Sequence, residues 1–516
     1  MAFMLYPYLI YSPIILTFLY ICYKHKNWSS SMPKNWPVLG MTPSLLWNFG
    51  SANEYVTDIL RHNGGTFMFK GPWFSNTDML ITSDPANFRY ISSTNFHNYP
   101  KGPHSREIFD VLGDGIFNCD STLWELHRKT TISLFKNVGF LKVVEKTMWN
   151  NMEKKLMPVL DFKSKQGSKM DLQEIFQRLT FDSIISLLLA YDPETLSIDF
   201  PYNAFENAFT KSEEALFNRY FLPKFFWKLL NRLHIGNEKY LSEASKLSDK
   251  LLYKFIKANR EKEATTTDNV EKEQVGDLCL LRGFMKEYKD QTGSFGDHDK
   301  FIKDTLFSLM VAGRDTTSSA LTSFFYLLAK NPLAEGKIRE EIHEKFGMKE
   351  GQKWKSFGSE DLEKLVYLQG ALYETLRLFS PLPANQKISL QTDTLPSGHQ
   401  VRKNSKIILH PYAMGHMETI WGDDCLEFKP ERWISDKGGI NYVPSYKFTA
   451  FHAGRRSCIG KEFSLIQMKI VAATMIYNYD IEVVEGYPRT QNASVFVQLK
   501  YGLMVKLNRR NEGNLN

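Results

Sequence analysis

The chain has 516 residues, which is enough for one large domain or two ordinary ones. Hydrophobic residues make up 43% and charged residues 23%, so the composition supports a large packed core and excludes a disordered tail or a fibre. The formal net charge is +7, without a dense Lys/Arg run. This pattern excludes a nucleic-acid partner and favours contact with anionic lipid or an acidic protein.

The five cysteines are widely and irregularly spaced, with no CxxC pair and no Cys/His cluster at zinc spacing. A disulfide framework and a zinc site are therefore excluded, and a reducing compartment fits best. We expect Cys22, Cys119, Cys279 and Cys425 to be inert, because a free cysteine usually behaves as a small buried hydrophobe. Cys458 has a different setting.

The first 23 residues, MAFMLYPYLIYSPIILTFLYICY, contain no charged side chain, and Lys24, His25 and Lys26 follow at once. About 20 apolar residues span a bilayer as a helix, and a basic cluster after the span stays cytosolic. The alternative is a cleaved signal peptide, but the start is uncharged and no small residues mark a cleavage site. We predict an uncleaved membrane anchor over residues 1–23.

Residues 24–40 form a basic and proline-rich linker, which predicts a stiff, extended connector. Beyond it, alternating apolar residues predict a strand pair at 65–71 and 78–82. Residues 121–260 show mainly helical periodicity. Residues 261–276 have almost no apolar side chain and predict a mobile surface loop.

A second long helical pattern covers residues 301–330, and residues 398–414 and 494–507 resemble strands. Helices dominate, and the few short strands lie near both ends of the sequence. This order predicts one α+β domain, mainly α, over residues 41–510, with strands from distant parts of the chain brought together. Residues 511–516 are a tail.

The stretch FHAGRRSCIG places one cysteine among glycines and arginines, just before a helical apolar pattern. A helix amino terminus favours a thiolate, and glycines allow close approach of the main chain. A lone cysteine there is more often a buried turn residue, but the wider pattern predicts a thiolate beneath a flat cofactor. In that pattern the aromatic ring shields the sulfur and one arginine neutralises a cofactor acid group. The residues are Phe451, Gly454, Arg456, Cys458 and Gly460.

This pattern resembles the haem-binding loop of the cytochrome P450 family, the haem-thiolate monooxygenases. Further motifs follow the family's order: WELHR at 124–128, AGRDTTS at 312–318, ETLR at 374–377 and FKPERW at 428–433. The resemblance covers the whole chain. It implies a single cytochrome P450 fold with a long central helix, small β-sheets and an N-terminal transmembrane anchor.

The resemblance also implies roles for individual residues. Cys458 would be the axial ligand of haem b, and Thr316 and Asp315 would deliver protons during oxygen activation. The alternative for the polar run in the helix is a kink made by hydroxyls bonding back to the backbone. Trp124 and Arg128 would reach a haem propionate. The alternative for Arg128 is that it lies on a solvated helix face and binds nothing. Lys387 is a weaker propionate candidate and is not assigned to the site. Arg314 is expected to face outward from the helix.

Glu374 and Arg377 are neighbours on one helix face, and Arg432 is the candidate third member of a network. An exposed pair would contribute almost nothing, whereas a buried pair needs further hydrogen bonds. The resemblance implies that this network shapes the fold around the haem loop and is structural.

The sequence carries no flavin or nicotinamide module, so electrons must come from another protein. With a membrane anchor, the resemblance implies NADPH–cytochrome P450 reductase at the endoplasmic reticulum membrane, with the catalytic domain cytosolic. A basic docking patch is expected near the thiolate. It comprises His127, Arg128, Lys129, Lys447, Arg455 and Lys461.

Segments 98–102, 112–120 and 412–433 resemble the plant branch that hydroxylates fatty acids and alkanes, most closely its mid-chain alkane hydroxylases. An apolar pocket suits such chains. Its expected lining is Ile108, Phe109, Val111, Leu112, Leu309, Met310 and Phe496. The alternatives are oxidative phenol coupling or hydroxylation of an alkaloid-like metabolite, a reductase-independent haem isomerase or ligand-binding protein, and a non-enzymatic membrane receptor.

Overall fold

A computed structural model describes residues 32–73, 75, 77–265, 279–289, 297–347, 358–488, 490–492 and 494–510. The predicted anchor (1–23), the tail (511–516) and most of the predicted loop at 261–276 lie outside these ranges. Across the ranges described, no helix is both long and apolar enough to cross a membrane.

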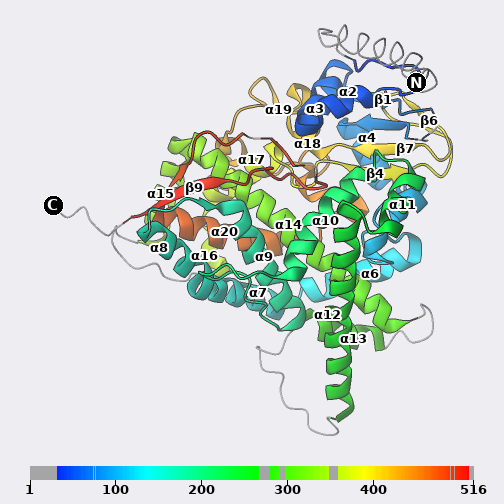
Figure 1. Cartoon of the computed structure of the whole chain (residues 1–516). Coiled ribbons are helices and arrows are strands. Elements are labelled where there is room, and N and C mark those ends of the chain that lie inside the picture. The colour runs from blue at the N-terminus through cyan, green and yellow to red at the C-terminus, as the bar shows by residue number, and fades with distance from the viewer. Residues whose placement is uncertain are drawn as a thin grey trace, which may run out of the picture.

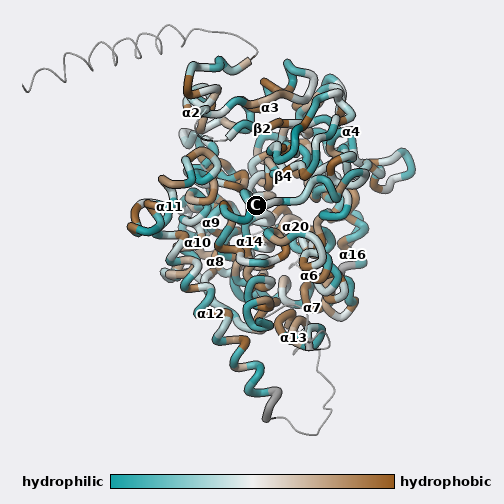
Figure 2. Tube along the Cα trace, turned by 90° about the vertical axis from the view of Figure 1, so that its right-hand side faces the viewer, coloured by the Kyte–Doolittle hydropathy of each residue, from teal (hydrophilic) through white to brown (hydrophobic). Residues whose placement is uncertain are grey.

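Helices make up most of the described chain, as the sequence predicts. They are α2 (Thr42–Trp47), α3 (Ala52–His62), α4 (Pro85–Arg89), α5 (Gly102–Ile108), α6 (Ser121–Phe135), α7 (Val138–Asn151), α8 (Met157–Lys165), α9 (Leu172–Leu189), α10 (Ala204–Asn218), α11 (Lys224–Leu233), α12 (Asn237–Thr265), α13 (Leu280–Lys289), α14 (His298–Lys330), α15 (Pro332–Phe346), α16 (Ser359–Glu363), α17 (Val366–Leu378), α18 (Pro411–Gly415), α19 (Glu418–Trp421) and α20 (Lys461–Asn478). Figure 1 shows α14 running through the helical part, whereas α12 projects from the body in Figures 1 and 2.

The strands form small sheets from distant parts of the chain, which confirms that expectation. The strands are β1 (Thr66–Phe69), β2 (Met79–Thr82), β3 (Met170–Asp171), β4 (Asn385–Ile388), β5 (Asp393–Thr394), β6 (Gln400–Val401), β7 (Lys406–Leu409), β8 (Tyr479–Val483) and β9 (Met504–Arg509). One sheet has the order β1-β2-β7-β4, with β2 and β7 parallel, and a second has the order β3-β9-β8. In Figure 1 the first sheet lies near α2 and α3, away from most of the helices.

Several predicted boundaries are wrong. The strand expected at 398–414 is interrupted, and its last part is α18, which begins at Pro411 with His410 capping the Ala413 amide at 3.1 Å. In the region expected to be a strand at 494–507, β9 starts only at Met504. Helix α12 continues to Thr265, into the expected loop.

The amino-terminal connector also differs from the extended form that its prolines predict. Trp36 and Gly40 pair through two backbone hydrogen bonds of 2.7 and 2.9 Å, so residues 36–40 form a turn. The Trp36 ring is buried and lies 6.0 Å from the Trp47 ring. A Cβ at Gly40 would lie 2.3 Å from the Gly71 carbonyl oxygen, so the turn packs too closely for a side chain there.

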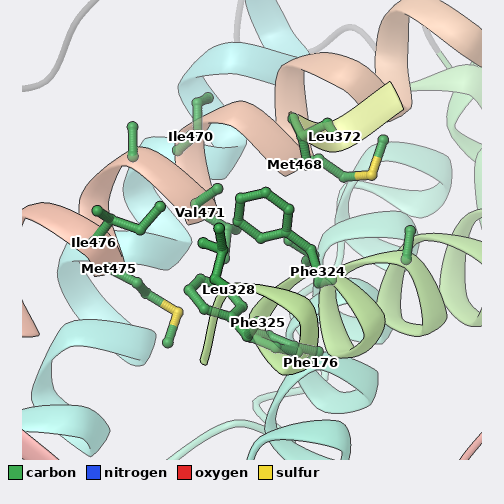
Figure 3. Packing of buried hydrophobic residues seen from close by; sticks show 14 of the residues in the cluster. Phe176, Phe324, Phe325, Leu328, Leu372, Met468, Ile470, Val471, Met475 and Ile476 are labelled. Atoms are coloured by element: carbon green, nitrogen blue, oxygen red, sulfur yellow. The ribbon is translucent and has the colours of Figure 1, made fainter. Parts of the chain in front are cut away.

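Helix α14 is the central element of the main core. Its start is capped by Asp297, whose carboxylate accepts the Asp299 and Lys300 amides. Figure 3 shows Phe324 and Phe325 of α14 meeting Phe176 of α9 and the apolar face of α20. The Phe176 and Phe325 rings stack at 5.5 Å. Each such buried side chain stabilises the fold by about 1.5–3 kcal/mol. This packing holds one face of α14 against α9 and α20, while other residues of α14, such as Thr316, line a cavity.

Candidate functional site

An internal cavity of about 350 Å³ lies between α14 and the loop before α20. It is bordered by the cysteine loop, by Thr316 and Asp315 of α14, and by Trp124 and Arg128 of α6. The structure therefore brings sequence-predicted residues from three distant segments to one place. Glu374, Arg377 and Arg432 lie elsewhere.

Cys458 lies three residues before α20, as expected, and its thiol is accessible from the cavity. The Cys458 amide donates to the Phe451 carbonyl at 2.8 Å and closes the loop. Burial raises the pKa of the Cys458 thiol, while the Gly460 amide, Arg128 and Lys461 act in the opposite direction. These are the groups that would stabilise a thiolate once a metal binds the sulfur.

The two loop glycines differ. Gly454 has a φ of +68°, and a Cβ there would lie 2.0 Å from the Ser92 carbonyl oxygen. A Cβ at Gly460 would meet nothing closer than 3.9 Å, so close packing does not require glycine there. Gly460 instead acts through its backbone amide, which lowers the pKa of the Cys458 thiol. The other three described cysteines, Cys119, Cys279 and Cys425, are buried, and Cys22 lies outside the described residues.

Several buried cations gather on one side of the cavity with too few anions. Arg456 donates to Asp120 at 2.7 Å and to the Cys119 carbonyl at 2.9 Å, but its Nε has no partner within the described chain. Burial, together with the nearby charge of Arg456, lowers the pKa of Lys101 to about 7. Burial also holds the pKa of Lys387 well below its usual value, and its Nζ has no hydrogen bond to any described residue.

This cluster fits the two acid groups of a haem. Lys101, Lys387 and Arg456 interact with one another electrostatically and share one nearby carboxylate, Asp120. Uncompensated buried cations are costly, and added carboxylates would pair with them. Lys387, which was not expected to be part of the site, interacts with this cluster without lining the cavity, whereas Lys101, which lines the cavity, was not predicted.

His452 is a second missed residue. It borders the cavity, and its buried Nε2 has no partner in the described chain. Burial, together with the charge of Lys387, lowers the pKa of His452 to about 3, so the ring is neutral and offers a hydrogen bond. The sequence around Lys101 and His452 gives no sign that they line the cavity, because segments distant in sequence create the cavity only in the folded chain.

Trp124 and Arg128 both border the cavity. Arg128 donates to the Ser457 carbonyl at 2.8 Å and to the Ser457 hydroxyl at 3.1 Å, next to Cys458. The Arg456 guanidinium lies 4.6 Å from the centre of the Trp124 ring. His127, expected on the docking surface, is instead buried and stacks on Phe301 at 3.9 Å. It is therefore not available to a partner.

The polar run on α14 faces two directions. Thr316 Oγ1 donates to the Ala312 carbonyl at 2.7 Å, and Thr316 also borders the cavity. The hydrogen bond to the helix backbone therefore does not exclude a role for Thr316 in the site. A Cβ at Gly313 would lie 2.8 Å from the Ile184 side chain, which shows how closely α9 approaches. The helix continues through these residues.

Arg314 does not face outward, as expected from sequence, but is fully buried against α10. Its guanidinium donates to Asp315 at 2.7 Å, to Glu206 at 2.6 Å and to Thr210 Oγ1 at 2.5 Å. Helix α9 contacts the same turn of α14, because the Thr180 side-chain hydroxyl donates to the Arg314 carbonyl at 3.0 Å. An acidic face on α10 was not visible from the motif alone.

Outside the cavity, Glu374 and Arg377 form a fully buried bidentate pair at 2.8 Å. Arg432 Nε lies 3.4 Å from Glu374, and the Trp433 indole donates to the same carboxylate at 2.9 Å. Arg377 also donates to the Cys425 carbonyl at 2.6 Å. The three predicted residues therefore meet, and they join α17 to the 425–433 segment.

Comparisons with known proteins agree with this geometry. A family model for cytochrome P450 matches residues 31–507. The chain is 41% identical to the alkane hydroxylase MAH1 of Arabidopsis thaliana, over 96% of this chain and 97% of that protein. It is 38% identical to noroxomaritidine synthase 2 of Narcissus pseudonarcissus, over 93% and 92%, and 40% identical to cytochrome P450 86B1 of Arabidopsis thaliana, over 92% and 85%. The chain belongs to the cytochrome P450 family and is a haem-thiolate monooxygenase.

Proposed function

We propose that the protein hydroxylates a long-chain aliphatic substrate, an alkane or a fatty acid, using O2 and electrons from NADPH. The supporting observation is the cavity wall, which is largely apolar beyond the thiolate. Five of the seven expected residues line it: Phe109, Val111, Leu112, Leu309 and Phe496. The other two, Ile108 and Met310, are buried in the surrounding core. Each methylene buried in such a cavity contributes about 0.8 kcal/mol.

The relatives support two substrate classes. The 41% identical relative is named an alkane hydroxylase, which favours the aliphatic class. The 38% identical synthase favours the second candidate, oxidative coupling or hydroxylation of an aromatic specialised metabolite. The wall also holds Phe117, Phe209, Tyr220 and Phe307, and such rings suit a flat aromatic substrate.

Haem supplies the oxygen activation when bound. Cys458 Sγ would bind its iron, while Arg456, Lys101 and Lys387 would hold its acid groups. Thr316 would hold a proton at Oγ1 on the cavity wall, and the adjacent Asp315 carboxyl would replace it. The apolar wall would exclude bulk water and orient the substrate carbon.

The electron donor would be NADPH–cytochrome P450 reductase at the endoplasmic reticulum membrane, with residues 1–23 as a single anchor and the catalytic body cytosolic. Around the thiolate loop, Lys129, Lys447 and Arg455 are exposed and could meet an acidic partner.

The test combines the protein with reductase in lipid vesicles and compares three probes: a long-chain alkane, a long-chain fatty acid and a methoxylated phenolic amine. We expect NADPH-dependent hydroxylated product and a low-to-high-spin shift with an aliphatic probe. The shift and product with the phenolic amine alone would replace the aliphatic assignment by the second candidate. Product without NADPH would contradict the monooxygenase cycle in both forms.

A further inference from the structure

Four charged side chains are buried together where α10 meets α14. Glu206 and Glu213 come from α10, and Arg314 and Asp315 from α14. Their side chains are at most 12% exposed. Three ionised carboxylates with one guanidinium would leave a net charge of −2 in the interior, which is expensive. At least one of these carboxyls therefore carries a proton.

Hydrogen bonding identifies the protonated group as Glu213. The Arg314 guanidinium donates to Glu206 at 2.6 Å and to Asp315 Oδ1 at 2.7 Å, but lies 3.7 Å from Glu213. Glu213 contacts neutral groups instead, the Ser494 hydroxyl at 2.5 Å and the Gln498 amide at 3.3 Å. A carboxyl without a direct cation is the one that stays neutral when buried.

The partner of that proton is Asp315. Asp315 Oδ2 is buried and accepts no bond from any described amide, hydroxyl or cation. Glu213 Oε1 and Asp315 Oδ1 lie 3.7 and 2.7 Å from the same Arg314 nitrogen, so the two carboxyls are close neighbours, and a proton on Glu213 would give Asp315 Oδ2 the donor that it lacks. Burial raises the pKa of Glu213 well above its usual value, and the Asp315 charge raises it further. Burial also raises the pKa of Asp315, whereas Arg314 opposes that shift.

Both carboxyls border the cavity, and Asp315 precedes Thr316. We propose that Glu213 stores the proton that Asp315 passes toward Thr316, so that proton delivery in this chain uses three residues, Glu213, Asp315 and Thr316. The proposal rests on the monooxygenase function, which consumes the proton. Glu213 acts through Asp315 and is not itself in contact with the reacting atoms.

The transfer is balanced within the cluster. An O–H bond breaks at Glu213 as one forms at Asp315 Oδ2, and Asp315 then releases its proton toward Thr316 Oγ1. A hydronium ion from solvent later returns a proton to the Glu213 carboxylate and leaves as water. Ser494 and Gln498 donate hydrogen bonds to Glu213, and one nitrogen of Arg314 lies within 3.7 Å of both carboxyls. The negative charge is thus stabilised on either residue during the transfer.

Infrared spectroscopy of the resting haem protein tests the stored proton directly. We expect the wild-type spectrum to contain a protonated carboxylic acid band, sensitive to D2O, that Glu213→Gln removes. Asp315→Asn is a second variant that removes the same band, because Glu213 can then ionise beside Arg314. The matched control is Glu214→Gln, the next residue on α10, whose carboxylate accepts the Asn237 amide at 2.7 Å. A spectrum unchanged by both Glu213→Gln and Asp315→Asn would overturn the proposal.

The amount of product formed per NADPH consumed distinguishes proton supply by Glu213 from a purely structural role. Glu213→Gln keeps a hydrogen-bond donor of similar size beside Asp315 but cannot release a proton. Since a positioned acid contributes roughly 10²–10⁴-fold, we expect product per NADPH to fall by about tenfold or more, with peroxide formed instead. Substrate-induced spectral shifts should persist. Loss of the band with unchanged product per NADPH would also overturn the proposal. A wild-type protein without any NADPH-dependent product would instead refute the monooxygenase function, while the infrared band still locates the proton.

Discussion

At the scale of single residues, the site combines one accessible thiol with an excess of buried cations. Cys458, Arg456 and Thr316 could be predicted because each belongs to a compact motif. Lys101 could not, because its significance depends on Asn385, 284 residues away, which accepts its ammonium group at 2.9 Å. Arg314 was misjudged for the same reason, since its partners lie on α10.

Lys101 makes haem binding depend on pH. Its pKa is lowered to about 7 in the haem-free site, mainly by burial, and propionates would raise it. Above pH 7, haem binding would therefore take up a proton, so haem affinity should fall as pH rises. Below pH 7 Lys101 is charged in both states and contributes no slope. Haem transfer to an acceptor protein measures this, and Lys101→Met should remove part of the slope. If haem affinity in Lys101→Met depends on pH as steeply as in the wild-type protein, another group causes the pH dependence.

At the scale of elements, the fold around the site depends on close contacts between segments far apart in sequence. Periodicity identified the long helix α14 and the β1–β2 pair, because both patterns are local. It misassigned 494–503, where Ser494 and Gln498 turn inward to Glu213 and no strand forms. The conformation of this segment depends on buried hydrogen bonds to Glu213 of α10, which lies 281 residues before Ser494 in the sequence.

The Glu374–Arg377 pair should be essential for stability. Arg377→Lys replaces a bidentate fork by a point charge inside the fold, and breaking a buried pair costs about 3–5 kcal/mol. We expect lower thermal stability and poor haem retention. Arg61→Lys is the control, because Arg61 and Asp58 have the same spacing but are exposed, and it should cost less than about 1 kcal/mol. Equal losses in both variants would contradict a special role for burial.

The approach of α9 to α14 can be tested with two glycines. Gly313→Ala would place a Cβ 2.8 Å from Ile184, whereas Gly336→Ala on α15 meets nothing within 4 Å. Overpacking costs about 1–3 kcal/mol, while replacing a helical glycine by alanine gains about 0.5–1 kcal/mol. Denaturant unfolding should therefore show Gly336→Ala stabilised and Gly313→Ala destabilised. Similar gains in both would show that the helix contact does not require glycine.

At the scale of the whole molecule, one helical body and its small sheets enclose the cavity. The order of helical and strand patterns predicted this arrangement, because the few short strands near both ends of the sequence have to come together in one α+β domain. The apolar stretch 1–23 lies outside the described residues, so its role as an anchor remains a prediction. Removing residues 1–23 should leave a haem-containing body with reduced membrane partition, measured by flotation and haem content. A truncated body that cannot take up haem would contradict a simple tether.

The most direct measurement is the absorption of the ferrous–carbonyl haem protein. We expect a long-wavelength band of thiolate-ligated haem in the wild-type protein and in Cys425→Ala, because the Cys425 thiol is buried and does not line the cavity. The band should be absent in Cys458→Ala, because the thiolate ligand is gone. A Cys458→Ala protein that keeps the band would show that Cys458 is not the ligand and would contradict the account.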